Sequence, residues 1–160
     1  MRPSRELLRA QSGLSLVELL VALAVLAILA VVALPVYQVL GVRGSRAEAQ
    51  ADLMACAQGM ERAVGMGFGY EGLVDSDADG VGDADTGPVS ANICSVTSLD
   101  YTLHVRTAST SGFTLRAVPT TAGNRVDGDG ALELDSDGTR RWDRNDDGDF
   151  DDQGERRWSE

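Results

Sequence analysis

The sequence is poor in histidine and cysteine, two side chains on which many enzyme active sites depend. Its 160 residues include one histidine, His104, and two cysteines, Cys56 and Cys94. The sequence suggests no nucleophile or second partner for His104, which falls on the polar side of a predicted strand. The absence of a clustered catalytic constellation argues against an enzyme, and we predict no catalytic residues.

Basic residues are also scarce relative to acidic ones. The chain has 14 Lys and Arg against 25 Asp and Glu, which gives a formal net charge of −11. Because nucleic-acid phosphates are bound by clustered Lys and Arg, this composition predicts no direct binding to nucleic acid. The excess of carboxylates instead favours cations.

One long apolar run is present near the N-terminus. Leu14 to Leu34 is 21 residues long, and its only polar members are Ser15 and Glu18. As a helix rising about 1.5 Å per residue, it would span about 30 Å, the thickness of a bilayer's hydrocarbon core. A secretory signal peptide usually has an apolar core of only about 7 to 15 residues followed by a small-residue cleavage site. This run is longer and has no such site, so it predicts a membrane-spanning helix.

The residues before the apolar run carry positive charge. Residues 1–13 contain three arginines and one glutamate and end in Gly13, so they should stay on the cytoplasmic side of a membrane. Without them, the formal net charge of −11 becomes −13 for the remainder of the chain.

The basic leader, Gly13, the apolar Leu14 and Glu18 together resemble the type IV prepilin signal, which type IV pilins and type II secretion pseudopilins share. The resemblance implies that prepilin peptidase cuts between Gly13 and Leu14 and that the new amino group is methylated. Glu18 falls at the family's fifth mature position and Pro35 at its kink-forming proline. Leu14 stands where most members have phenylalanine or methionine.

Glu18 is costly inside a membrane. A carboxylate at the bilayer centre costs about 2.5 to 3.5 kcal/mol on insertion scales, although Glu18 lies in the first turn, where the cost is smaller. One interpretation is a side chain that snorkels to the interface. In a filament packed from such helices, the freed amino group of a neighbouring Leu14 could instead neutralise it. The resemblance therefore predicts that Glu18 sets the register of subunit docking in assembly, and is not a catalytic acid.

The remaining residues fit one small domain. Residues 14–37 form the hydrophobic membrane or filament-core helix, and residues 38–65 are predicted to continue it as an amphipathic helix. Apolar side chains recur there at spacings of four, three and four, as expected of one helical stripe, at Leu53, Ala57, Met60 and Val64. Glycines from Gly65 onward end the helix, and residues 66–97 are predicted as a loop region.

Residues 98–160 carry three strand signals and an acidic C-terminal region. The stretch SLDYTLHVR alternates, with one face formed by Leu99, Tyr101, Leu103 and Val105. The stretches GFTLRAVP and GALELDSDGTRRW give further strands, the last with a turn at Asp137 and Gly138. We therefore expect an α+β fold, in which a long N-terminal helix packs on a small antiparallel sheet. The pilin resemblance implies the same fold.

Two aspartate-rich loops fit the start of a calcium-binding pattern. Alternate oxygen-bearing side chains followed by a glycine can supply the six to eight oxygens that calcium prefers. The candidate ligands are Asp75, Asp77, Asp79 and Asp83 in the first loop and Asp143, Asn145, Asp147 and Asp151 in the second. Neither loop completes an EF-hand, because its twelfth position is Thr86 or Gly154 rather than glutamate. A solvated acidic loop remains the alternative to a calcium cofactor in each case.

Cys56 and Cys94 permit one disulfide. A domain outside the cytoplasmic membrane lies in an oxidising compartment, which favours the bond, and a buried pair of free thiols is the alternative. Pilins often carry a disulfide that closes a C-terminal loop, but residues 127–158 contain no cysteine. Bound calcium is an alternative means of stabilising that region.

The leading hypothesis is a structural subunit of a type IV pilus, with a minor pilin foremost. A type II secretion pseudopilin and a membrane-anchored calcium-binding protein that never assembles are the alternatives. The pilin hypothesis implies other pilin subunits and prepilin peptidase as partners. It places the chain in the inner membrane before assembly and in an extracellular filament afterwards. Adhesion, twitching motility, DNA uptake and secretion all stay open as roles of that filament.

Overall fold

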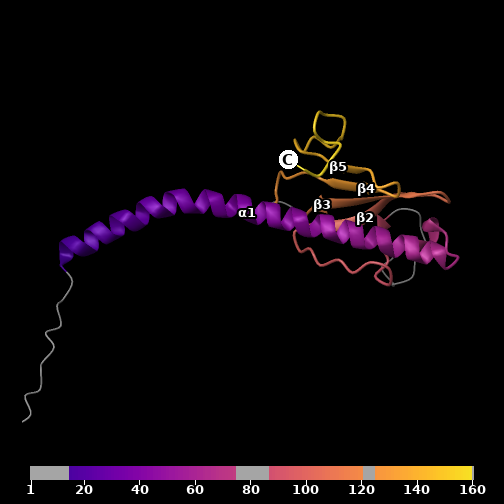
Figure 1. The fold of residues 1–160 in the computed structure, drawn as a ribbon, viewed down its shortest axis with the longest axis horizontal. Helices are drawn as coiled ribbons and strands as arrows, with labels where there is room; N and C mark the ends of the chain where they lie inside the picture. The colour runs from indigo at the N-terminus through magenta and orange to yellow at the C-terminus, as the bar shows by residue number, and fades with distance from the viewer. Residues whose placement is uncertain (1–14, 75–86, 121–124, 160) are drawn as a thin grey trace, which may run out of the picture. The chain divides into compact units, whose positions relative to one another are not determined.

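The computed structural model describes residues 15–74, 87–120 and 125–159. The chain divides into two compact units, residues 1–37 and residues 38–160. One helix, α1, runs over Leu16–Gly65, and a short 3-10 helix, η1, covers Tyr70–Leu73 (Figure 1). The predicted single long helix is confirmed over its described part.

The part of α1 in the first unit is apolar on all sides. Its described side chains are exposed, and the most apolar window of α1 has a mean hydropathy of 3.1. By length and composition, α1 can cross a membrane. A helix with no polar face needs lipid or other helices around it.

The part of α1 in the second unit packs through one stripe. Leu53 and Met60 are fully buried, and Ala57 and Val64 pack against the core at its edge. This spacing places one side of the helix against a sheet and leaves the other side polar, as the sequence pattern predicts.

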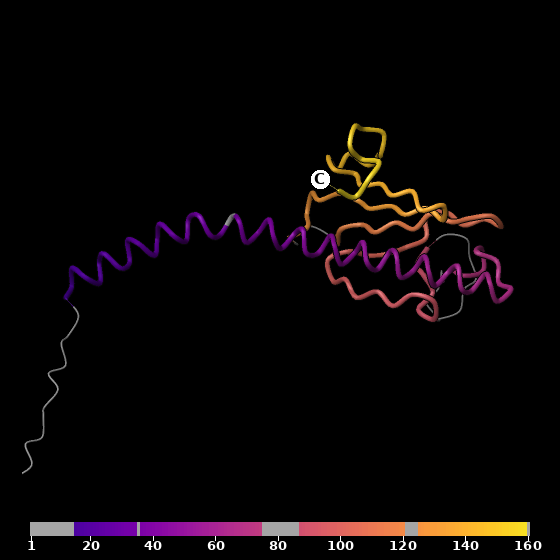
Figure 2. Tube along the Cα trace, viewed as in Figure 1, coloured from indigo at the N-terminus to yellow at the C-terminus, as the bar shows by residue number. Residues whose placement is uncertain are grey.

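The sheet has five antiparallel strands in the order β1-β2-β3-β4-β5. Their bounds are Gly87–Pro88 for β1, Tyr101–Ala108 for β2, Phe113–Pro119 for β3, Leu132–Asp135 for β4 and Arg140–Trp142 for β5. Figure 2 shows strands β2 to β5 following one another as a meander beside α1. The α+β fold is therefore confirmed, and Asp137 and Gly138 form the predicted turn between β4 and β5.

Two details differ from the sequence prediction. Leu99, expected on the inward face, is 87% exposed, because β2 begins at Tyr101 and Leu99 lies in the bend before it. Strand β1 was not predicted, because its two residues have no alternation of side chains. Gly87 and Pro88 pair with Val105 and His104 through the backbone.

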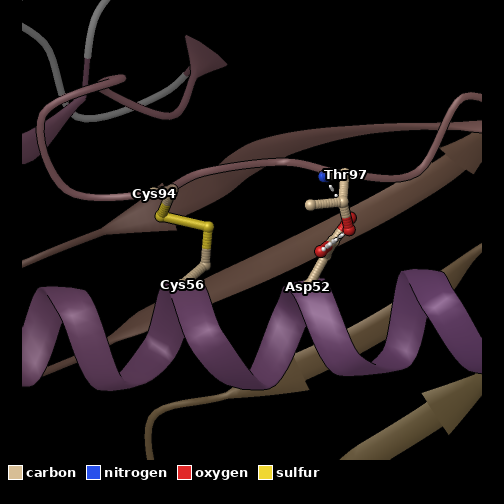
Figure 3. The surroundings of a disulfide bond; sticks show 4 residues. All are labelled: Asp52, Cys56, Cys94 and Thr97. Atoms are coloured by element: carbon tan, nitrogen blue, oxygen red, sulfur yellow. Dashed lines mark hydrogen bonds between the residues drawn. A yellow bond between two sulfur atoms is a disulfide. The ribbon is translucent and has the colours of Figure 1, made fainter.

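Figure 3 shows a covalent and polar clamp between α1 and the segment before β2. Cys56 and Cys94 form a disulfide, which confirms the predicted bond. One turn earlier on α1, the buried carboxylate of Asp52 accepts hydrogen bonds from the backbone N–H and hydroxyl of Thr97 at 2.8 Å. Together these contacts hold the segment against the helix.

A second polar cluster joins α1 to the sheet. The guanidinium of Arg46 pairs with the carboxylate of Asp129, and the hydroxyl of Tyr101 donates to the same carboxylate. The guanidinium also lies 3.7 Å from the ring centroid of Trp142, whose Nε1 donates to the Asp129 carbonyl. Burial, together with the nearby carboxylate, raises the pKa of Tyr101. We call these four residues the inner cluster.

Candidate functional site

The sheet places a row of charged residues on the face opposite the apolar core. Side chains alternate along each strand, so Glu133, between the buried Leu132 and Leu134, points to the other face. Arg116 of β3 pairs in register with Glu133, and Glu133 pairs with Arg141 of β5. Arg106 of β2 reaches the same point from one strand further away.

Three guanidiniums converge on this one carboxylate. Arg106 Nη1 lies 2.7 Å and Arg116 Nη2 lies 2.8 Å from Glu133 Oε1, and Arg141 Nε lies 3.0 Å from Oε2. Glu133 is 0% exposed, whereas the Arg106 side chain is 50% exposed. Although burial opposes its ionisation, the guanidiniums of Arg116 and Arg106 hold the pKa of Glu133 below its usual value.

Among the groups in direct contact, guanidiniums outnumber carboxylates. Asp135 accepts from Arg141 at 2.9 Å, so three guanidiniums pair with two carboxylates, Glu133 and Asp135. We call Arg106, Arg116, Glu133 and Arg141 the arginine face. All 14 basic residues of the chain are arginines, which bind planar anions through two donors at once.

A cavity of about 510 Å³ opens on the arginine face. Its lining includes Arg106, Glu133 and Arg141 from the sheet, and Asp149, Phe150, Asp151 and Arg156 from the chain after β5. The guanidinium carbon of Arg116 lies 5.1 Å from the Phe150 ring centroid, and that of Arg141 lies 5.9 Å from it. This volume is in the range of small-ligand sites, roughly 300 to 1,000 Å³.

The loop after β5 contains the second predicted calcium site. The carboxylate oxygens of Asp143 accept from the backbone N–H groups of Asp147 at 3.1 Å and Gly148 at 3.0 Å, and Asn145 donates to Asp147 at 2.7 Å. Over the described ranges, no three His, Cys, Asp or Glu side chains gather in a group that could hold a metal ion. The first loop, with Asp75, Asp77, Asp79 and Asp83, lies outside the described residues. Calcium binding therefore stays a prediction for both loops.

The predicted processing site also lies largely outside the described residues. Gly13 and Leu14 belong to that part, and Glu18 lies in the first turn of α1 with its side chain exposed. An acidic residue there interacts favourably with the helix dipole. The pairing of Glu18 with a neighbouring amino group stays a prediction.

Sequence analysis did not identify the arginine face. Arg106 ends the alternating stretch SLDYTLHVR, but a single strand does not reveal which charges lie beside it. The register of four strands brings these side chains together. The one local signal of this site was Glu133, a glutamate between two core leucines. It became informative only once its neighbours on the adjacent strands were known.

Family comparisons agree with the fold and the N-terminal motif. A prokaryotic N-terminal methylation motif matches residues 8–34, which include Gly13, Leu14 and Glu18. Together with the apolar helix and the antiparallel sheet, this match places the protein in the class of type IV pilins and pseudopilins, which share the motif. A second family model, described as type IV minor pilin ComP, DNA uptake sequence receptor, matches residues 35–130. Because that match spans more than half of the 160 residues, the chain belongs to the type IV minor pilin ComP family.

The protein is accordingly a structural minor pilin of a type IV pilus, as the leading hypothesis predicts. Among curated proteins and among solved structures, nothing matches the chain. The match over residues 35–130 includes Arg106 and Arg116 but ends before Glu133 and Arg141.

Proposed function

We propose that this minor pilin contacts DNA during uptake and that the arginine face makes the contact. The description of the matched family as a DNA uptake sequence receptor supports the proposal. The observation that carries it is the convergence of three guanidiniums on one buried carboxylate, on a face of the sheet where the Arg106 side chain is half exposed. Such an array presents an excess of donors to phosphate oxygens.

The proposal departs from the prediction, based on the net charge, that the chain does not bind nucleic acid directly. A formal charge of −11 describes the whole chain, whereas charges in water are screened beyond about 8 Å at physiological ionic strength. A phosphate in contact with Arg106 therefore responds mainly to the charges of the arginine face and its immediate surroundings. The acidic remainder should slow association and make binding weaker than on a basic protein.

Glu133 has a positioning role in this proposal. Free arginine side chains lose rotamer entropy when they bind a phosphate. Hydrogen bonds to Glu133 already hold Arg106, Arg116 and Arg141 in one place, so less of that cost is paid on binding.

Affinity for double-stranded DNA tests the proposal. Full-length protein in detergent is titrated with a fluorescent duplex, and Arg106→Gln is compared with Arg62→Gln on the exposed side of α1. Both variants lose one positive charge. We expect Arg106→Gln to weaken binding by about three- to tenfold and Arg62→Gln to change it little. Equal effects of the two variants would contradict a contact at the arginine face.

We also propose that the chain enters the pilus by the pilin route. Prepilin peptidase would cut after Gly13, and Glu18 would pair with the methylated amino group of Leu14 on a neighbouring subunit. The methylation motif over residues 8–34 supports this route, as does the apolar helix that would anchor the chain in the inner membrane before it joins the extracellular filament.

Processing and pairing have separate tests. Mass spectrometry of the mature protein should give a chain that begins with methylated Leu14, and Gly13→Ala should leave a longer membrane-bound form. Glu18→Val should insert into the membrane but assemble poorly, because the partner amino group loses its counter-ion. Assembly of Glu18→Val at the wild-type level would contradict the pairing.

A further inference from the structure

An acidic segment lies against the arginine face. Residues 147–151, which we call the acidic strap, carry Asp149 and Asp151 on either side of Phe150. These three residues line the same cavity as Arg106 and Arg141. The strap therefore lies where a phosphate group would approach the arginines.

The loop that bears the strap is fixed at both ends. The Trp142 N–H donates to the Glu155 carbonyl at 2.8 Å, and the Asp143 N–H donates to the Ala131 carbonyl at 2.9 Å. The buried carboxylate of Glu155 accepts from the backbone N–H groups of Arg144 and Asp152. The strap is thus held near the face even if its tip moves.

The strap itself is held to the sheet by an aromatic contact. Within the strap, hydrogen bonds are local: Asp149 N–H donates to the carboxylate of Asp147, and Asp151 N–H to that of Asp149. In the described part of the chain, no hydrogen bond or ion pair joins the strap to a strand of the sheet. The contact is the Phe150 ring on the guanidiniums of Arg116 and Arg141. A ring in that position covers part of the guanidinium surface. The contact is easily broken, because an exposed cation–π interaction is weak.

We propose that the acidic strap competes with DNA for the arginine face, an inference that rests on the proposed DNA contact. Asp149 and Asp151 lie on the cavity that a phosphate must enter, so they repel it at short range. Phe150 covers Arg116 and Arg141 and must move aside for a phosphate to reach them. A phosphate and the closed strap therefore compete for Arg116 and Arg141, and the strap lowers the affinity for DNA.

Neutralising the strap tests the repulsion. Asp149→Asn with Asp151→Asn is compared with Glu48→Gln with Glu71→Gln, which removes the same two charges at exposed sites on α1 and η1. In duplex titrations with full-length protein in detergent, we expect the strap variant to bind about three- to tenfold more tightly than this control. Equal affinities of the two variants would overturn the competition.

Phe150→Ala tests the cover and needs no DNA. Arg116 and Arg141 should react faster with phenylglyoxal in this variant, as measured by peptide mass spectrometry, while Arg62 should react at the wild-type rate. The variant should also bind the duplex more tightly. Unchanged labelling, or weaker DNA binding, would overturn the proposed competition. The Phe150 ring would then contribute to DNA binding instead of shielding the two arginines from DNA.

The two proposals fail in different ways. If wild-type protein binds DNA and Arg106→Gln weakens binding, but the strap variants behave like their controls, only the strap is wrong. If Arg106→Gln and Arg62→Gln bind DNA equally, the DNA contact itself is wrong, whatever the labelling shows.

Discussion

The inner cluster and the arginine face are both built from arginine and carboxylate, yet they differ in balance and exposure. In the inner cluster, Arg46 and Asp129 have side chains that are 10% and 7% exposed, and Trp142 covers the guanidinium. On the arginine face, three guanidiniums share Glu133, and the Arg106 side chain is half exposed. A buried pair of one guanidinium and one carboxylate, such as Arg46 and Asp129, can only stabilise or specify the fold. On the arginine face, the half-exposed Arg106 leaves donors available for a ligand.

Breaking the inner cluster should have the largest effect on stability. Asp129→Asn removes the carboxylate charge that pairs with the buried Arg46, and breaking a buried pair costs about 3 to 5 kcal/mol of unfolding free energy. For a unit of this size, the melting temperature should fall by on the order of 10 °C. Circular dichroism of the full chain in detergent measures it. Asp127→Asn, an exposed neighbour, is the control, and equal melting of the two variants would contradict an enclosed pair.

The loop after β5 extends the comparison to carboxylates, such as those of Asp143 and Asp147, that form no ion pair with an arginine of the described residues. If calcium supplies the missing positive charge, a hundredfold excess over its dissociation constant adds about 2.7 kcal/mol to the unfolding free energy. The full chain should then melt at higher temperature in millimolar calcium than in chelator. Asp143→Ala with Asp147→Ala should abolish that difference if the second loop dominates, and Asp75→Ala with Asp79→Ala tests the first. Equal curves in calcium and chelator would leave both as solvated acidic loops.

Glu133→Gln should cost less stability than Asp129→Asn, because water can solvate the partly exposed arginines that lose their partner. We expect a loss of about 1 to 3 kcal/mol in unfolding free energy. A loss as large as that of Asp129→Asn would show that the arginine face is part of the core and would remove the contrast between the clusters.

Lowering the pH should also reveal the contribution of the Glu133 carboxylate to stability, with a smaller effect than the substitutions above. The pKa of Glu133 is lower in the folded protein than its usual 4.5, so the unfolded state binds more protons in acid. The stability that Glu133 contributes is present above about pH 4.5 and is lost as the pH falls through its folded pKa. Urea unfolding across pH 3 to 6 should therefore show a shallower acid-side loss for Glu133→Gln than for wild type. Parallel curves would mean that Glu133 ionises as it does in the unfolded chain.

Much of the fold is predictable because its signals are local. The stripe of Leu53 and Met60 and the alternation over Tyr101 to Val105 are periodic within one element, and each residue reports its own burial. Strand β1 is two residues long and pairs through the backbone, so it leaves no such pattern. Leu99 follows the alternation but precedes the strand.

The site was less predictable because its members are far apart in the chain. Arg106 and Glu133 are 27 residues apart, and Arg116 and Glu133 are 17 apart. Only the strand register places them together. Net charge pointed away from nucleic acid because a sum over 160 residues does not show where three guanidiniums converge.

The salt dependence of DNA binding tests the account most directly. Each phosphate that an arginine neutralises makes the slope of log affinity against log salt for duplex DNA more negative by about 0.9. Wild-type full-length protein should show a measurable negative slope, and Arg106→Gln with Arg116→Gln should reduce its magnitude by about two, while Arg62→Gln leaves it unchanged. An identical slope for the wild type and the double variant would contradict the arginine face as the DNA contact.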